Sequence, residues 1–128
     1  MLTNTDFTTG YTAIPNVLAP YVAVRVNAHI EFHTWGFFDK FFGVEISQKI
    51  QDLDETEQTA ILDKAKSALT YYIYAKWLEQ DKTLTDIGSV KEQSSTGVKG
   101  MDVQRYAYCY NKAVYLSKSF GDWLKLQT

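Results

Sequence analysis

Apolar residues recur every three or four positions through the middle of the chain, and this spacing constrains the fold more than any other feature of the sequence. The stretch opens with Asp54-x-x-Glu57, which is typical of a capping box at the start of a helix. One helix face would then carry an apolar stripe made of Ile61, Ala65, Ala68, Leu69, Tyr72, Ile73 and Trp77. We therefore predict a helix that buries this stripe, within a fold built mostly from helices.

A second stripe of the same kind closes the chain. Asp102 is placed to cap a helix that would run to about Leu126. Its predicted buried face carries Val103, Tyr106, Ala107, Tyr110, Val114, Ser117 and Leu124. Gly121 falls inside this predicted helix, although glycine is unfavourable in a helix interior.

Residues 20–34 fit two kinds of secondary structure. Apolar and polar residues alternate from Val22 to Phe32, as they do in a half-buried strand. The same stretch places apolar residues at helical spacing from Val22 to Ile30, and Pro20 suits the first position of a helix. A strand over all 11 residues would be about twice the mean strand length of roughly 5–6 residues. We predict a helix.

Aromatic residues make up 15% of the chain, and five of them fall within the nine residues from Trp35 to Gly43. The two Phe-Phe pairs in this cluster are four residues apart, so a short helix would stack their rings on one side.

Tyrosines on a second face of two predicted helices are candidates for an interface. Tyr71 and Tyr74 flank the buried stripe of the middle helix. Tyr108 and Tyr115 lie seven residues apart on a second face of the last helix. Protein interfaces are enriched in aromatic residues, and a small core uses one stripe per helix. We predict these four tyrosines as interface anchors. One alternative is that a compact domain buries both sides of each helix, and another is that exposed rings stack nucleic-acid bases, which the acidic balance of the chain disfavours.

The stretch 82–100 is polar and contains three glycines, and its piece 84–90 favours β-structure. We predict a β-hairpin or an extended arm here, with its turn around 93–97, inserted before the C-terminal helix of a small antiparallel helical bundle. A connection this long is usually functional or disordered. As a docking arm it would present Lys91 and Lys99. The length of 128 residues suits a single domain, 1–128, that includes this arm.

Charge and composition argue against several classes of protein. The net charge of −2 disfavours a nucleic-acid binder that relies on neutralising phosphates. The charge is uneven, with 13 acidic and eight basic residues in 1–98 against two acidic and five basic in 99–128. No apolar run approaches the roughly 18 residues of a membrane span, and the N-terminus lacks the pattern of a signal peptide. A single cysteine rules out an intramolecular disulfide.

The residues that could carry chemistry form no recognisable catalytic motif. His29, Glu31 and His33 would share one face of a strand as metal ligands, but they do not share one face of a helix. Cys109 has no evident base, so we predict a small interior residue. Carboxylates gather at a predicted helix start, where they complement the helix dipole: Asp52, Asp54, Glu55 and Glu57. We predict no enzyme and no catalytic, cofactor or metal site, with a metal-dependent enzyme built on the His29 cluster as an alternative.

The order of these features resembles that of small head–tail connector (adaptor, head-completion) proteins of tailed phages and prophages. Leu2-Thr3-Asn4-Thr5-Asp6-Phe7 is similar to their T-x-E-D-F opening, and the run 14–21 is similar to their entry into a first long helix. The run 28–39 resembles the end of that helix, a glycine break and an aromatic F-Y-D turn. The insertion with Ile87-Gly88-Ser89-Val90 and a closing helix that ends Phe120-Gly121-Asp122-Trp123-Leu124 follow in the same order.

The resemblance implies a structural virion protein at the head–tail junction, made in the cytoplasm of a bacterial host. Such proteins form homo-oligomeric rings between the portal protein and tail or neck proteins, and packaged DNA passes through the channel without sequence-specific binding. They have no membrane partner. The alternative from a different class is a small helical regulatory or DNA-binding module in which Arg105, Lys112 and Lys118 face phosphate.

Overall fold

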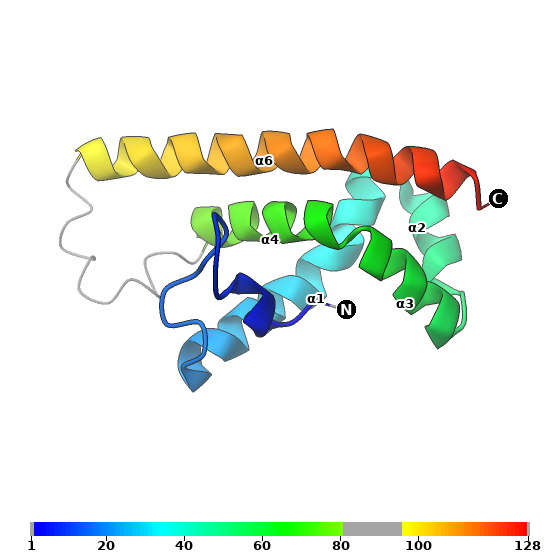
Figure 1. Cartoon of the computed structure of the whole chain (residues 1–128), viewed down its shortest axis with the longest axis horizontal. Helices are drawn as coiled ribbons and strands as arrows, with labels where there is room; N and C mark the ends of the chain where they lie inside the picture. Colours follow the sequence, from blue (N-terminus) through cyan, green and yellow to red (C-terminus); the bar gives the residue numbers. More distant parts are fainter. Residues whose placement is uncertain (1, 81–95, 128) are drawn as a thin grey trace.

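Helices form the framework of the computed structural model, which describes residues 2–80 and 96–127, with side chains from residue 103 onward in the last helix (Figure 1). The elements in chain order are η1 (Asn4–Phe7), α1 (Pro20–Phe42), α2 (Val44–Gln51), α3 (Glu55–Lys64), α4 (Lys66–Gln80) and α6 (Thr96–Lys125). No strand occurs within the described ranges. The prediction of a mostly helical protein is confirmed.

Two long helices lie side by side and run in opposite directions: α4 and α6 (Figure 1). Helix α1 runs obliquely across α4, while α2 and α3 lie near the C-terminal end of α6. The predicted β-hairpin or arm spans residues 82–100, and most of it, residues 82–95, lies outside the residues that the structure describes. Residues 96–100 already belong to α6, so the part of the predicted arm and turn that falls on them is wrong.

Helix α1 confirms the helical prediction for 20–34 and extends beyond it. Pro20 stands in the first turn, where its missing N–H has no helical partner to lose. The helix continues through Gly36, so the glycine break that the resemblance implies there is absent. It ends at Gly43, whose φ of 93° lies in the region that favours glycine. The buried face is one continuous row of Val22, Val26, Ile30, His33, Thr34, Phe37 and Phe38.

The predicted middle helix is two helices, α3 and α4, which meet at Ala65. Asp54 caps the first of them as predicted, because its carboxylate accepts the backbone N–H of Glu57 at 2.8 Å. Ala65 is itself 1% exposed and sits at the bend. The predicted stripe nonetheless packs inward, with Ala65, Ala68, Leu69, Tyr72, Ile73 and Trp77 all buried.

Helix α6 begins six residues before the predicted cap at Asp102, and its buried face differs from the predicted one. The buried side chains are Cys109, Ala113, Ser117, Phe120 and Leu124. Val103 is 67% exposed and Ala107 is also exposed, so both were assigned to the wrong face. Gly121 lies against the ring of Phe42, whose Cε1 would be 3.0 Å from an added Cβ. This glycine lets the end of α1 pack closely against α6.

The Phe cluster at the end of α1 packs against rings from α4 and α6, with Phe37 and Phe38 fully buried and Phe41 and Phe42 partly buried. The ring of Phe37 is 5.5 Å from that of Tyr72, and the ring of Phe38 is 5.8 Å from that of Phe120. The Phe41 ring lies one turn after Phe37 on the same side of the helix, as the spacing predicts, and meets the Phe37 ring edge-to-face at 4.9 Å between ring centres. Edge-to-face contacts of this kind add to the stability gained from burying the rings.

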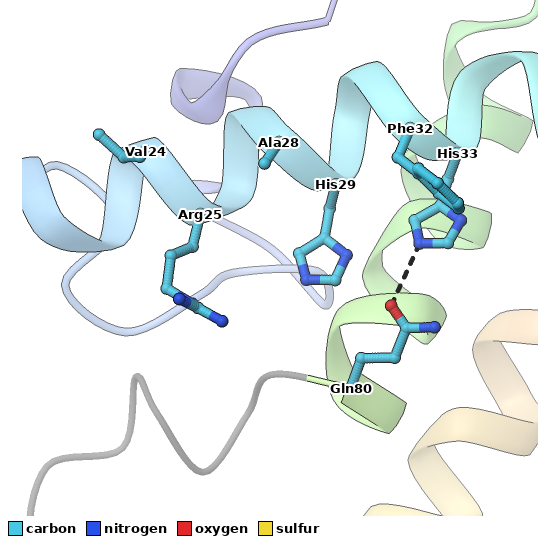
Figure 2. A pocket seen from close by; sticks show the side chains of 7 residues that line it. All are labelled: Val24, Arg25, Ala28, His29, Phe32, His33 and Gln80. Carbon is cyan, nitrogen blue, oxygen red and sulfur yellow. Dashed lines mark hydrogen bonds between the residues drawn. The ribbon is translucent and has the colours of Figure 1, made fainter.

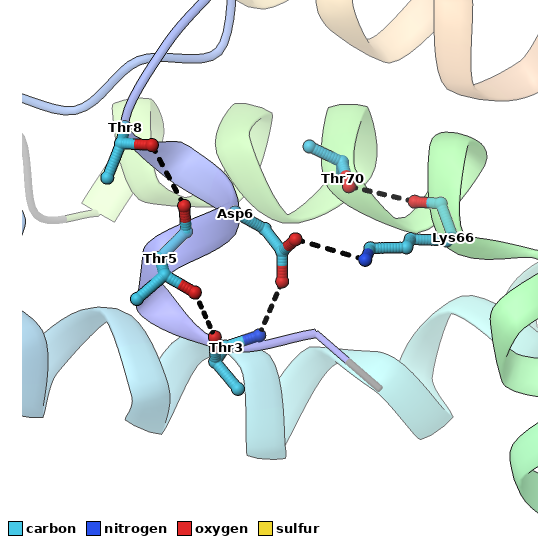
Figure 3. Close-up of polar contacts among 6 residues, drawn as sticks. All are labelled: Thr3, Thr5, Asp6, Thr8, Lys66 and Thr70. Atoms are coloured by element: carbon cyan, nitrogen blue, oxygen red, sulfur yellow. Dashed lines mark hydrogen bonds and ion pairs between the residues drawn. The ribbon is translucent and has the colours of Figure 1, made fainter.

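The N-terminal segment is fastened to the helices by the burial of Phe7 and by the polar contacts that Figure 3 shows. The Phe7 side chain is fully buried. The Asp6 carboxylate accepts the backbone N–H of Thr3 at 2.9 Å and pairs with Lys66 of α4 at 3.1 Å. Partial burial alone would raise the pKa of Asp6, but these two contacts lower it. The segment is therefore part of the packed structure.

Candidate interaction surface

Tyrosines from three separate parts of the chain meet on the outside of α4 and α6. The Tyr108 ring of α6 lies 4.7 Å from the ring of Tyr11, in the segment before α1, and 6.4 Å from the ring of Tyr71 on α4. Tyr11 is 50% exposed and Tyr108 is 46% exposed. We call these three residues, together with Tyr115, Arg105 and Lys112 of α6, the tyrosine patch.

Two basic residues hold the rings of this patch in place. The Arg105 guanidinium donates a hydrogen bond to the Tyr74 hydroxyl at 3.1 Å and stands 5.7 Å from the centre of the Tyr11 ring. The Lys112 ammonium stands 5.6 Å from the centre of the Tyr115 ring. Such cation–π contacts are worth about 0.5–1 kcal/mol at exposed sites. These two contacts favour the observed orientations of the Tyr11 and Tyr115 rings.

The four tyrosines predicted as interface anchors divide between surface and core. Tyr115 is 65% exposed, Tyr108 is about half exposed and Tyr71 is partly buried. Tyr74 is 1% exposed, so its prediction as an accessible anchor is wrong. Its ring packs 5.4 Å from that of Trp77 on the same helix, and α4 is covered by α1 on one side and by α6 on another.

The remaining predicted residues contribute less to this surface. Lys91 lies outside the described residues, and Lys99 lies on α6 where only the backbone is described. Tyr11 was not predicted as part of the surface, and no signal in the sequence places it beside Tyr108, since it lies outside any helical stripe. Burial, together with the neighbouring Tyr108, raises the pKa of Tyr71.

The histidines of α1 border an open pocket of about 490 Å³ (Figure 2). The rings of His29 and His33 stack 5.4 Å apart, and Nε2 of His33 lies 3.3 Å from Oε1 of Gln80. Glu31 is not among the lining residues, since it lies two positions after His29 and therefore on the opposite side of the helix from that histidine. Within 2–80 and 96–127 no three His, Cys, Asp or Glu side chains gather as metal ligands do.

Two further predictions concern helix α6. Cys109 is fully buried, as predicted for an interior residue, and burial raises the pKa of its thiol to about 11. The basic residues proposed to face phosphate do not share one side of the helix. Arg105 and Lys112 belong to the tyrosine patch, whereas Lys118 lines a separate groove.

No helix within the described part of the chain has the length and apolar character that a bilayer span requires. No protein-family model matches the chain, and neither a curated protein nor a solved structure matches it significantly.

Proposed function

We propose that this chain is a structural assembly protein, a head–tail connector subunit that forms a homo-oligomeric ring between the portal and the tail of a phage or prophage particle. The observation that carries the proposal is the tyrosine patch, in which Tyr11, Tyr108 and Tyr115 are exposed and Arg105 stands over the Tyr11 ring. Tyrosine and arginine are the residues most enriched among the energetic hot spots of protein interfaces.

The construction of the patch also favours binding to protein. Arg105 is held by Tyr74, and Tyr108 is held between Tyr11 and Tyr71, so little side-chain freedom is lost when a partner covers them. Contacts that are arranged before binding cost less free energy to use. The ring, the portal and tail partners, the virion location and the absence of enzymatic activity come from the resemblance of the chain to connector proteins.

Assembly of the full chain tests this function. Light scattering and analytical ultracentrifugation over a wide concentration range should give species heavier than the 14.6 kDa chain, and electron microscopy of those species should give rings. The double variant Tyr108→Ser/Tyr115→Ser should self-associate at least about 30-fold more weakly, as loss of a hot spot worth 2 kcal/mol would cause.

Val103→Ser is the matched control, because Val103 is also exposed on α6 and lies outside the patch. A chain that stays at 14.6 kDa at every concentration would contradict the proposal, as would a double variant that assembles like the wild type.

A DNA-binding or regulatory module is the second candidate. Arg105 and Lys112 stand over tyrosine rings, and exposed rings beside basic groups can also stack nucleic-acid bases. Binding of single-stranded or duplex DNA that weakens steeply with salt, and that the Tyr108→Ser/Tyr115→Ser variant loses, would favour this function over assembly.

A further inference from the structure

An open groove lies at the end of the molecule where α2, α3 and the C-terminal half of α6 meet the end of α1. Its volume is about 990 Å³. Its apolar lining includes Phe41, Phe42, Ile46, Ile50, Ile61 and Leu124. Its charged lining residues are three lysines, Lys49, Lys118 and Lys125, and two acids, Glu57 and Asp122. We call it the terminal groove; it is apolar inside and has an excess of one positive charge.

The outer face of α1 carries a row of exposed apolar side chains. Tyr21 is 51% exposed, Val24 is 69% exposed and Phe32 is 77% exposed, and Ala28 between them is also exposed. Val24, Ala28 and Phe32 lie three, seven and eleven positions after Tyr21. The four side chains therefore follow one side of the helix over about three turns. We call these four residues the α1 ridge, and three of them are labelled in Figure 2.

The charges beside the ridge have the opposite balance to those of the groove. Glu31 and Asp39 are exposed and fall on the same side of α1 as the ridge, and Arg25 adjoins its first turns. The ridge side therefore has an excess of one negative charge. Apolar side chains at this helical spacing are what an amphipathic helix presents to a hydrophobic groove.

We infer that the α1 ridge of one copy binds in the terminal groove of the next copy. This inference rests on the proposed function, because it requires the chain to self-associate. The first turn of α1 lies far from the end where α2, α3 and the C-terminus gather (Figure 1). Ridge and groove are different surfaces, so the contact is heterologous and leaves one of each open for a further copy, as a ring requires.

The groove and the tyrosine patch are neighbours on α6, which lets one docked copy cover both. Tyr115 lies three residues before Lys118 and seven before Asp122, so these side chains adjoin on the helix surface. Four ridge side chains alone would bury less than the roughly 800 Å² per partner of a standard interface. Contact with Tyr115 and Tyr108 supplies further apolar area.

Mixing two variants tests the inference. Phe32→Asp places a charge on the ridge and leaves the groove intact, whereas the double variant Ile46→Asp/Lys118→Glu alters the groove and leaves the ridge intact. Each variant alone should self-associate at least about 30-fold more weakly than the wild type. An equimolar mixture should form a dimer, because one good ridge can still meet one good groove.

Val103→Asp is the control, since it adds the same charge at an exposed position outside both surfaces. Circular dichroism checks that each variant is folded, and Phe32→Ser replaces Phe32→Asp if the charge prevents folding.

Three outcomes would overturn the inference. If the wild type assembles and Phe32→Asp assembles equally well, the ridge is not the contact, while the proposed function stands. If both variants are weakened but their mixture forms no dimer, ridge and groove do not bind each other. If the wild type is monomeric throughout, both proposals fail.

Discussion

His33 is a buried histidine whose surroundings favour its neutral form. Burial lowers its pKa, the neighbouring His29 lowers it further, and the hydrogen bond with Gln80 opposes them. The pKa in the folded state is therefore below the unfolded value of 6.5. Protonation then favours the unfolded chain, so this contribution to stability is complete above pH 6.5 and is lost as the pH falls through the lowered pKa.

We expect the free energy of unfolding to fall as the pH drops from 8 through 6.5 and below, because the unfolded chain binds a proton that His33 resists in the folded state. Urea titrations across this range measure the fall. His33→Gln should flatten the curve, because glutamine has no proton to gain. His29→Gln is the control and should keep most of the slope. Equal slopes for wild type and His33→Gln would show that His33 is not the group responsible.

Gly36 and Gly121 both lie inside helices but have different surroundings. A Cβ added at Gly36 meets nothing within 4 Å, whereas one added at Gly121 lies 3.0 Å from Cε1 of Phe42. Alanine stabilises a helix interior by roughly 0.5–1 kcal/mol relative to glycine. We expect Gly36→Ala to gain about this amount in urea denaturation, and Gly121→Ala to stay within about 0.5 kcal/mol of wild type because the Phe42 ring must shift. Equal gains would mean that the ring moves without cost.

At the scale of the element, the start of α3 depends on one side chain. The Asp54 carboxylate accepts a hydrogen bond from the backbone N–H of Glu57 at 2.8 Å. An N–H in the first turn of a helix has no carbonyl partner within the helix, so this bond supplies the missing acceptor. Asp54→Ala should lower the free energy of unfolding by about 1 kcal/mol, while Asp54→Ser keeps an acceptor and should lose much less. Thermal or urea denaturation of the two variants distinguishes them. A loss of the same size in both would show that the charge of Asp54, and not its hydrogen bond, matters.

Local signals predicted the starts of α1 and α3, but not the start of α6, which lies six residues before the predicted cap at Asp102. Pro20 and Asp54 act within one helical turn, and both predictions are confirmed. The bend at Ala65 and the continuation of α1 past Gly36 depend on packing between helices, which no short stretch of sequence encodes. The prediction of the buried face of α6 was partly wrong for a similar reason. A stripe that includes Val103 fits helical spacing, but packing against α4 determines which side of α6 is buried, and Val103 is exposed.

At the scale of the whole molecule, the candidate surface could be predicted only in part. Tyr108 and Tyr115 lie off the predicted buried stripe of the last helix, and both are exposed. Tyr74 met the same criterion but is buried, because α4 is covered from more than one side. Tyr11 joins the patch through a contact between residues 97 positions apart, which follows from the fold and not from any local pattern.

The N-terminal segment should be as necessary for folding as any helix. The Phe7 side chain is fully buried in the core, with 0% of its surface accessible to solvent. The Phe7 carbonyl accepts the backbone N–H of Ile14 at 2.8 Å. Removal of a buried Phe side chain costs about 3–5 kcal/mol, a large part of the 5–15 kcal/mol that stabilises a typical domain. We expect Phe7→Ala to lose that much, with unfolding still seen as one transition.

Phe32→Ala supplies the matched control for Phe7→Ala, because it removes the same atoms from a side chain that is 77% exposed. In dilute solution it should change the free energy of unfolding by no more than about 0.5 kcal/mol. Urea denaturation followed by circular dichroism and by tryptophan fluorescence measures both variants. If Phe7→Ala lost no more stability than Phe32→Ala, or if the two probes gave separate transitions, the segment before α1 would be an attachment to the helices. One shared transition and a loss several times larger than that of Phe32→Ala would mean that residues 2–19 and the helices fold as one unit.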